Sequence, residues 1–129
     1  MRILLVEDDE RIVQFMKRGL EAEAYQVDVA LDGQIGLDLA RTCPYDVIIL
    51  DVYLPEKNGL EVCRVVREAR LKIPILIMTA KDSPEIQKQG FLAGASDYLP
   101  KPFSFDVLLS KIEKWSPAST PLSSRNSPS

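Results

Sequence analysis

The chain has 129 residues, of which 46% are hydrophobic and 27% charged, a composition that suits one soluble globular domain with a single core. Its formal net charge of -3 argues against direct nucleic-acid binding by this chain, because a mildly acidic domain neutralises few phosphates. No apolar run approaches the roughly 20 residues of a membrane span and no signal-peptide layout precedes the first predicted strand, so we expect a cytoplasmic protein without membrane association.

Apolar residues alternate along the chain between strand-like runs and helix-like spacings. Short runs rich in branched residues predict strands, and apolar residues every three or four positions predict helices. In chain order we expect strand 2–7, helix 11–23, strand 26–30, helix 32–41, strand 46–50, helix 58–70, strand 73–78, helix 83–95, strand 96–100 and helix 104–115. Residues 116–129 are rich in Ser and Pro, which predicts a flexible tail or linker.

This alternation predicts an α/β fold, in which a parallel five-stranded sheet forms the middle layer of a three-layer sandwich. Right-handed crossovers leave few possible strand orders, and the flavodoxin-like (βα)5 order 2-1-3-4-5 is the one expected. In such sheets ligands bind beyond the carboxyl ends of the strands. Functional residues are therefore expected at those ends.

Four of the five predicted strands are followed by polar side chains that this fold would gather in one cleft. These are Glu7, Asp8 and Asp9 after the first strand, Asp51 after the third, Thr79 after the fourth and Lys101 after the fifth. Taken alone, a carboxylate, a hydroxyl or a lysine at a strand end is ordinarily a loop or surface residue. Their coincidence at neighbouring strand ends predicts a site.

The chemistry of this residue set favours phosphoryl transfer. Converging carboxylates repel one another unless one is protonated or a cation binds, and hard oxygen ligands with room for water suit Mg²⁺. Asp51 would then act as a nucleophile that forms an acyl phosphate. Lys101 and Thr79 would contact the phosphoryl oxygens, one as a point charge and the other as a hydroxyl donor.

Four stretches together resemble the receiver (response-regulator) domain of two-component signalling: LLVEDD at 4–9, DVIILDVYLPEKNGLEV at 46–62, IPILIMTA at 73–80 and GASDYLPKPF at 94–103. The overall pattern is most similar to the receivers of winged-helix transcription regulators. The resemblance implies that residues 1–115 are a receiver domain phosphorylated on Asp51 by a sensor histidine kinase. It implies no turnover enzyme, because such a domain accepts a phosphoryl group and slowly loses it.

The resemblance also assigns the metal ligands. Asp8 and Asp51 would bind Mg²⁺ directly, together with the backbone carbonyl of Tyr53. Glu7 would belong to the acidic pair without being a direct ligand. Asp9 is an extra acid in this pattern and is expected to begin the following helix.

The remaining roles concern the switch. Thr79 would be the switch hydroxyl and Tyr98 the aromatic residue that turns inward on activation, while Lys101 would bind the phosphoryl group. The Lys101–Pro102 peptide resembles the cis peptide of the family. Activation would alter the surface formed by the fourth helix, the fifth strand and the fifth helix.

Two enzyme classes with related folds fit the sequence less well. A haloacid-dehalogenase-type hydrolase needs a second Asp two residues after the nucleophile, where this chain has Tyr53. A flavin-binding domain needs a Ser/Thr/Gly phosphate loop after the first strand, and VEDDER at 6–11 is acidic instead. The chain contains no histidine, so it cannot donate or relay a phosphoryl group as phosphohistidine.

The output is left open between the receiver part of a DNA-binding transcription regulator and a stand-alone receiver that acts by protein contact. A homodimer through helix 83–95, strand 96–100 and helix 104–115 is possible by resemblance. In winged-helix receivers this surface usually carries an Arg, an Asp and a Glu at positions where this chain has Gln89, Ser96 and Val107. The charged residues Asp97 and Lys111 of the same surface are kept. Ile86, Leu92 and Phe105 stand where charged or polar residues, or a proline, are common. Neutral drift and a more apolar partner surface both account for this.

Overall fold

The structure is a computed structural model that describes residues 1–80 and 83–117, and strands and helices alternate along it as predicted. The elements are β1 (Arg2–Val6), α1 (Glu10–Ala22), β2 (Gln26–Ala30), α2 (Gly33–Thr42), β3 (Val47–Asp51), α3 (Gly59–Glu68), β4 (Ile75–Ala80), α4 (Pro84–Ala93), β5 (Asp97–Lys101) and α5 (Phe105–Glu113). The predicted tail at 116–129 lies outside the described residues beyond Pro117. No helix within the described ranges is long and apolar enough to cross a membrane.

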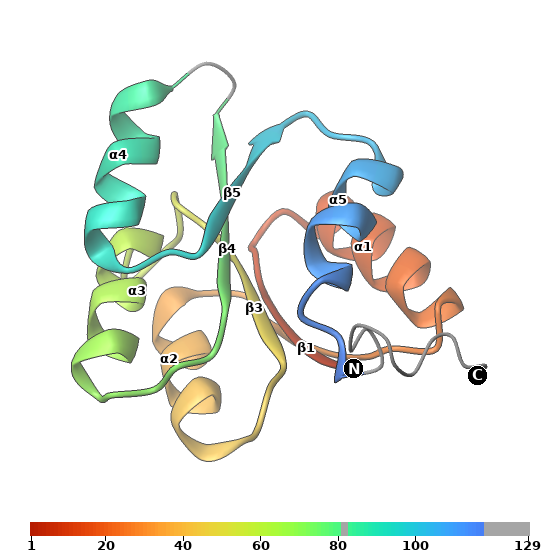
Figure 1. Ribbon diagram of the computed structural model, residues 1–129, viewed down its shortest axis with the longest axis horizontal. Helices are drawn as coiled ribbons and strands as arrows, with labels where there is room; N and C mark the ends of the chain where they lie inside the picture. The colour runs from red at the N-terminus through yellow and green to blue at the C-terminus, as the bar shows by residue number, and fades with distance from the viewer. Residues whose placement is uncertain (81–82, 118–129) are drawn as a thin grey trace.

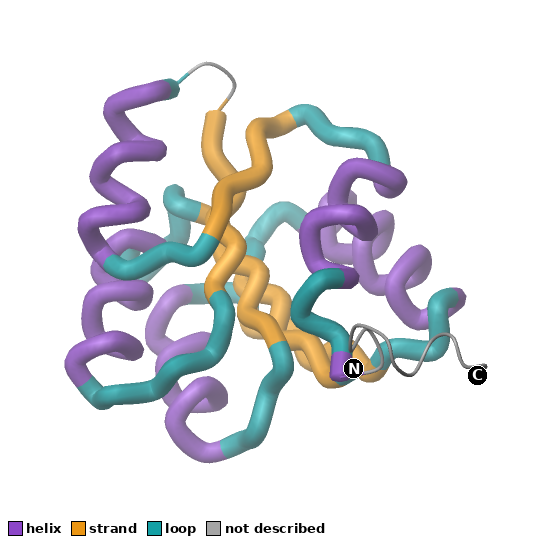
Figure 2. Tube along the Cα trace, in the orientation of Figure 1, coloured by secondary structure: helices purple, strands orange, loops and turns teal. Residues whose placement is uncertain are grey.

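The five strands form one parallel sheet in the order β2-β1-β3-β4-β5, which confirms the predicted fold class. Figure 1 shows α2, α3 and α4 on one face of the sheet and α1 and α5 on the other. The tube in Figure 2 makes the three layers plain, with the strands between two groups of helices. All strands therefore point their carboxyl ends toward the same edge.

Two apolar clusters, one on each face, hold the sheet in place. In β1, Ile3 and Leu5 pack toward α1 and α5, whereas Leu4 and Val6 pack toward α2 and α3. Every residue of β3 is buried, which explains why this strand reads as an unbroken apolar run up to Asp51. Burying a large aliphatic side chain contributes about 1.5–3 kcal/mol. The strand that carries Asp51 is thus fixed by packing on both sides.

Side-chain caps begin most of the helices. The Asp9 carboxylate accepts hydrogen bonds from the backbone N–H groups of Arg11 and Ile12 and so caps α1, as expected for this acid. Asp32, Asn58 and Ser104 cap their helices in the same way.

Most element ends differ from the prediction by one or two residues, and two of the differences have a local backbone reason. α4 ends at Ala93 rather than near residue 95, because Gly94 adopts a left-handed conformation with φ of 109° and terminates the helix. β4 begins two residues later than expected, after Pro74, which has no N–H to donate to the sheet. The strand then extends through Thr79, which pairs in register with Pro100.

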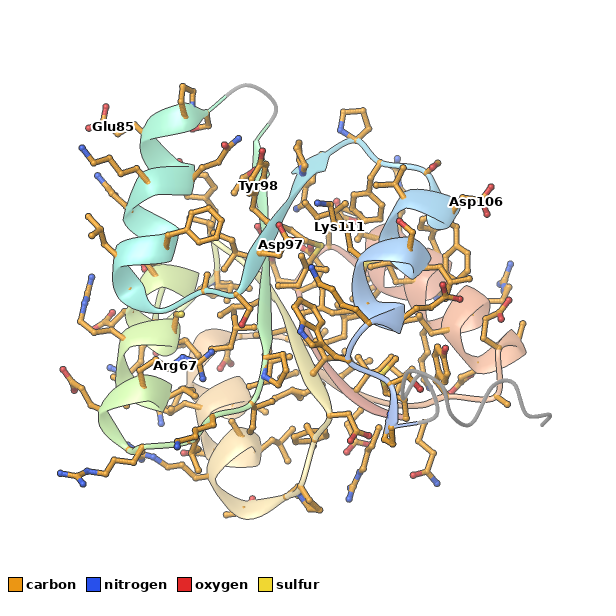
Figure 3. All side chains as sticks on the ribbon, viewed as in Figure 1. Arg67, Glu85, Asp97, Tyr98, Asp106 and Lys111 are labelled. Atoms are coloured by element: carbon orange, nitrogen blue, oxygen red, sulfur yellow. The ribbon has the colours of Figure 1, made fainter. Side chains whose placement is uncertain are left out.

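The C-terminal end of α4 is attached to α3 by two side chains. The Cys63 thiol lies 3.4 Å from the Ala93 carbonyl oxygen and donates to it. Arg67 Nε donates to the Gly94 carbonyl at 2.9 Å, and another guanidinium nitrogen donates to Leu71 at 2.8 Å. Figure 3 shows Arg67 between α3 and this end of α4. Burial raises the pKa of Cys63 to about 11, so the thiol keeps its proton as a donor.

The N-terminal half of α4 is held by fewer buried contacts, with Ile86 only partly buried against the core. The buried residues of this helix, Gly90 and Ala93, both lie in its C-terminal half. A Cβ at Gly90 would overlap the side chain of Ile77, so the helix lies directly against β4 there. Ser83 at the other end forms no side-chain capping hydrogen bond with any described residue.

Candidate phosphoryl-acceptor site

Three carboxylates from two neighbouring strands meet at the carboxyl edge of the sheet. One oxygen each from Glu7, Asp8 and Asp51 lies within 4.8 Å of the other two. Glu7 and Asp51 are buried and Asp8 is exposed. Because these ligands are hard oxygens and one side is open to water, the set fits Mg²⁺.

A single lysine bridges the two buried acids. Lys101 Nζ lies 3.1 Å from Glu7 Oε1 and 3.1 Å from Asp51 Oδ2. The other oxygen of Glu7 accepts the backbone N–H of Asp9 at 3.0 Å. Both Glu7 oxygens are therefore engaged by the protein, and Asp51 is engaged by Lys101 and by the backbone N–H of Tyr53. The exposed carboxylate of Asp8 is the one most open to a cation. The Lys101–Pro102 peptide is cis, as the resemblance implied.

The electrostatics of the cluster favour a bound cation. Burial raises the pKa of Glu7, and the charge of Asp51 adds to this, so that the opposing effects of the Asp9 N–H and Lys101 are outweighed. Burial alone would lower the pKa of Lys101, but the two adjacent carboxylates raise it, so the lysine stays charged. When all three acids are ionised, one ammonium faces three carboxylates and two negative charges are left uncompensated. A divalent cation would match them.

The strand ends beside Asp51 carry the other predicted residues. The Tyr53 N–H donates to Asp51 Oδ1 at 3.3 Å, and the Tyr53 side chain is exposed. Ligation by the Tyr53 carbonyl stays a prediction. The Thr79 hydroxyl is buried and has no hydrogen-bond partner among the described residues. An unpartnered buried hydroxyl is costly, and it is expected to take a partner in another state of the site.

Tyr98 lies apart from the carboxylates, on the edge strand β5 between α4 and α5. Its ring contacts Phe91 from α4 and the ammonium of Lys111 from α5. Sequence reasoning missed these two neighbours, because Phe91 and Lys111 come from separate helices and no motif links them.

Gly59 at the start of α3 also escaped the sequence analysis, although it fixes the backbone of Asp51. Its N–H donates to the Val52 carbonyl at 2.7 Å, and a Cβ at this position would overlap the carbonyl oxygen of Asp51. Only a glycine lets α3 approach the end of β3 this closely. The preceding Asn58 caps the helix, and this N-G pair is the signal that could have revealed the contact.

A family model for the response regulator receiver domain matches residues 3–113. The chain belongs to this family. This receiver is 41% identical in sequence to response regulator MprA of Mycolicibacterium vanbaalenii, in an alignment that covers 94% of this chain and 52% of MprA. It is 44% identical to response regulator ArlR of Staphylococcus epidermidis over 85% of this chain and 50% of that relative. The receiver thus spans about half the length of the curated relatives it matches.

Solved receiver structures share its architecture. The receiver domain of the Francisella response regulator 1452 superposes with a TM-score of 0.84 at 35% identity, covering 88% of this chain and 94% of that one. The chemotaxis protein CheY4 of Vibrio cholerae gives a TM-score of 0.83 at 34% identity, covering 89% of this chain and 98% of that one. The predicted fold and family are both confirmed by these comparisons.

Proposed function

We propose that Asp51 of this receiver accepts a phosphoryl group from the phosphohistidine of a sensor kinase and that the α4–β5–α5 surface transmits the change. The observation that carries the proposal is the contact of one lysine with two buried acids, Glu7 and Asp51, beside the exposed Asp8. A site short of positive charge favours a divalent cation, and this cation together with Lys101 can then stabilise an incoming phosphoryl group.

In the transfer, an Asp51 carboxylate oxygen attacks phosphorus, the phosphorus–nitrogen bond of the phosphohistidine breaks, and the imidazole leaves. Lys101 Nζ lies 3.1 Å from Asp51 Oδ2, so its ammonium can donate to a phosphoryl oxygen once Asp51 is phosphorylated. Mg²⁺, held by Asp8, Asp51 and the Tyr53 carbonyl, would neutralise further phosphoryl charge. Water later hydrolyses the acyl phosphate, so the domain stores a signal and is not a turnover enzyme.

The output we propose is transcriptional, with this chain as the receiver part of a longer DNA-binding regulator. Its support is the length of the response regulators MprA and ArlR, about half of which this chain covers. The alternative is a stand-alone receiver that acts by protein contact. In either case, the acidic chain described here would not itself bind DNA.

The proposal is tested by incubating the protein with acetyl phosphate and Mg²⁺, reducing the acyl phosphate with borohydride and mapping the product by mass spectrometry. Label is expected on Asp51 and is expected to vanish in Asp51→Asn. Label on another carboxylate, or undiminished label in Asp51→Asn, would overturn the assignment.

The two adjacent acids Asp8 and Asp9 are expected to respond differently to mutation. Asp8→Ala removes a predicted direct ligand and should weaken Mg²⁺ binding by about 10–100-fold or more, since loss of an indirect partner of a metal site already costs about that much. Asp9→Ala should leave Mg²⁺ binding nearly unchanged and lower stability by about 1 kcal/mol, because this carboxylate caps α1. Calorimetric titration with Mg²⁺ and urea unfolding measure the two effects. Equal losses of affinity would mean that the ligand has been assigned to the wrong acid.

We also propose that the activated receiver self-associates weakly through the α4–β5–α5 surface. Of the apolar residues noted in the sequence, Leu92 and Val107 are 77% and 44% exposed, whereas Ile86 and Phe105 pack against the two cores. Asp97, a candidate for ion pairing across a dimer, pairs with Lys111 and Lys114 of its own chain. Apolar contact therefore has the larger share of the proposed interface.

Association is accordingly expected to change little with salt, which screens charges but not apolar contact. Sedimentation of the beryllofluoride-treated protein at low and high salt measures this, with the untreated protein as the weaker reference. Dissociation at high salt would favour a charged interface. A monomer under both conditions would favour a receiver with a different partner.

A further inference from the structure

Tyr98 is held between two helices at the open edge of the sheet. Its ring lies edge-on to Phe91 of α4, with centroids 6.0 Å apart and an interplanar angle of 85°. On the α5 side, Lys111 Nζ lies 5.3 Å from the centre of the ring, within range of a cation–π contact. The ring is partly buried against the apolar cluster beneath α4, and the two contacts, from different helices, both favour its present position.

The ammonium of Lys111 is in turn positioned by Asp97, the neighbour of Tyr98 on β5. Asp97 Oδ2 lies 3.5 Å from Lys111 Nζ and 3.1 Å from Lys114 Nζ, and Asp97 Oδ1 accepts the Tyr98 N–H at 2.8 Å. Burial raises the pKa of Asp97, but these donors outweigh it and the pKa is lowered overall. Figure 3 shows Asp97 and Tyr98 next to each other on β5, with Lys111 reaching toward them from α5.

The second lysine of this group has a different neighbour. Lys114 pairs with the same Asp97 oxygen, yet its ammonium lies 4.7 Å from the ring centre of Trp115. Lys111 in α5 and Lys114 at its C-cap thus share one carboxylate, and of these Lys111 is the one over the Tyr98 ring. Comparing substitutions of Lys111 and Lys114 therefore separates the effect of the cation over the Tyr98 ring from the effect of positive charge near Asp97.

We propose that Phe91 and Lys111 form a latch that holds the Tyr98 ring in its present position between α4 and α5 and sets how readily the receiver switches. The proposal rests on the proposed function, in which phosphorylation of Asp51 is coupled to an inward turn of Tyr98. In the sheet Ile77 pairs with Tyr98 and Thr79 lies two residues further along β4, so Thr79 and Tyr98 share one face. The Thr79 hydroxyl, which has no hydrogen-bond partner among the described residues, lies on the face that Tyr98 shares. Lys111 is thus a positioning residue that acts on the switch through Tyr98.

Lys111→Met keeps the length of the side chain and removes the cation. Ligand that binds the inward state becomes tighter in proportion to the population of that state. We expect Lys111→Met to tighten the apparent binding of beryllofluoride with Mg²⁺ by about two- to fivefold, the range that a partly exposed cation–π contact supports. Lys111→Arg, which keeps a cation over the ring, should bind like the wild type. Lys114→Met, which removes the same charge beside Asp97, should also bind like the wild type.

A second measurement needs no phosphoryl analogue. In the untreated protein, the nuclear Overhauser effect between the Phe91 and Tyr98 rings should weaken in Lys111→Met and persist in Lys114→Met. Equal affinity in Lys111→Met and wild type, an equal gain in Lys114→Met, or an unchanged ring contact would overturn the latch. Failure of the wild type to bind beryllofluoride would instead count against the proposed function. In that case the nuclear Overhauser effect between the Phe91 and Tyr98 rings alone would test the latch.

Discussion

Replacing Lys101 by methionine is expected to lower the free energy of unfolding of the metal-free protein by about 3 kcal/mol. The lysine is the partner of both Glu7 and Asp51, and without it two buried carboxylates would face each other unpaired. Leaving a buried charge without its partner costs more than losing an exposed pair. The value lies at the low end of the range because 26% of the Lys101 side chain is exposed.

Mg²⁺ should restore much of this loss, since a cation at the carboxylates replaces the missing positive charge. Urea unfolding with and without Mg²⁺ measures both effects. Lys57→Met is the matched control, because Lys57 pairs with Glu61 at 3.6 Å on the surface and should contribute less than about 1 kcal/mol. Similar losses of stability in the two variants, or a stability of Lys101→Met that Mg²⁺ does not change, would contradict the role of Lys101 in neutralising the charge of Glu7 and Asp51.

Replacing Gly59 by alanine is expected to destabilise the protein by about 1–3 kcal/mol and to slow phosphorylation of Asp51. The added methyl group would overlap the carbonyl oxygen of Asp51 and crowd the backbone of Val52. Backbone atoms at the end of a buried strand cannot rotate away as a side chain can. The strain therefore falls on the residue that accepts the phosphoryl group.

Gly19→Ala supplies a control with the opposite expectation. A Cβ at Gly19 in α1 meets the ring of Phe105, a partly exposed side chain that can shift, and alanine favours the helix by about 1 kcal/mol. Thermal unfolding and acetyl phosphate labelling of both variants test the contrast. Normal labelling of a fully stable Gly59→Ala would show that the close approach of α3 does not matter for the site.

The sheet and its order were predictable because period and composition are local signals. β3 is buried on both faces, so its apolar run identified a central strand, and the position of Asp51 followed from the rule that sites lie at strand ends. The end of α4 was less predictable. Gly94 could have been taken for a helix residue or for its terminator, and only its left-handed conformation decides between them.

The meeting of Glu7, Asp8, Asp51 and Lys101 at one edge of the sheet was predictable, but their mutual contacts were not. Lys101 and Glu7 are 94 residues apart in the chain, and no local pattern encodes that one lysine contacts two acids. Likewise, Asp97 was expected to be a candidate for pairing between molecules, but α5 supplies two lysines within the same chain. Such contacts depend on how two elements pack, which sequence periodicity does not report.

The unequal attachment of α4 has a mechanical consequence. Cys63 and Arg67 donate hydrogen bonds that attach the carbonyl groups of Ala93 and Gly94 to α3. At the other end, near Thr79, the Ser83 side chain accepts no capping hydrogen bond from a described residue. A rod fixed at one end pivots when its other end is pushed. Over ten residues, about 15 Å of helix, a small displacement beside Thr79 would tilt α4 about its Gly94 end. A partner protein bound across α4 would then respond to a change in the orientation of this helix.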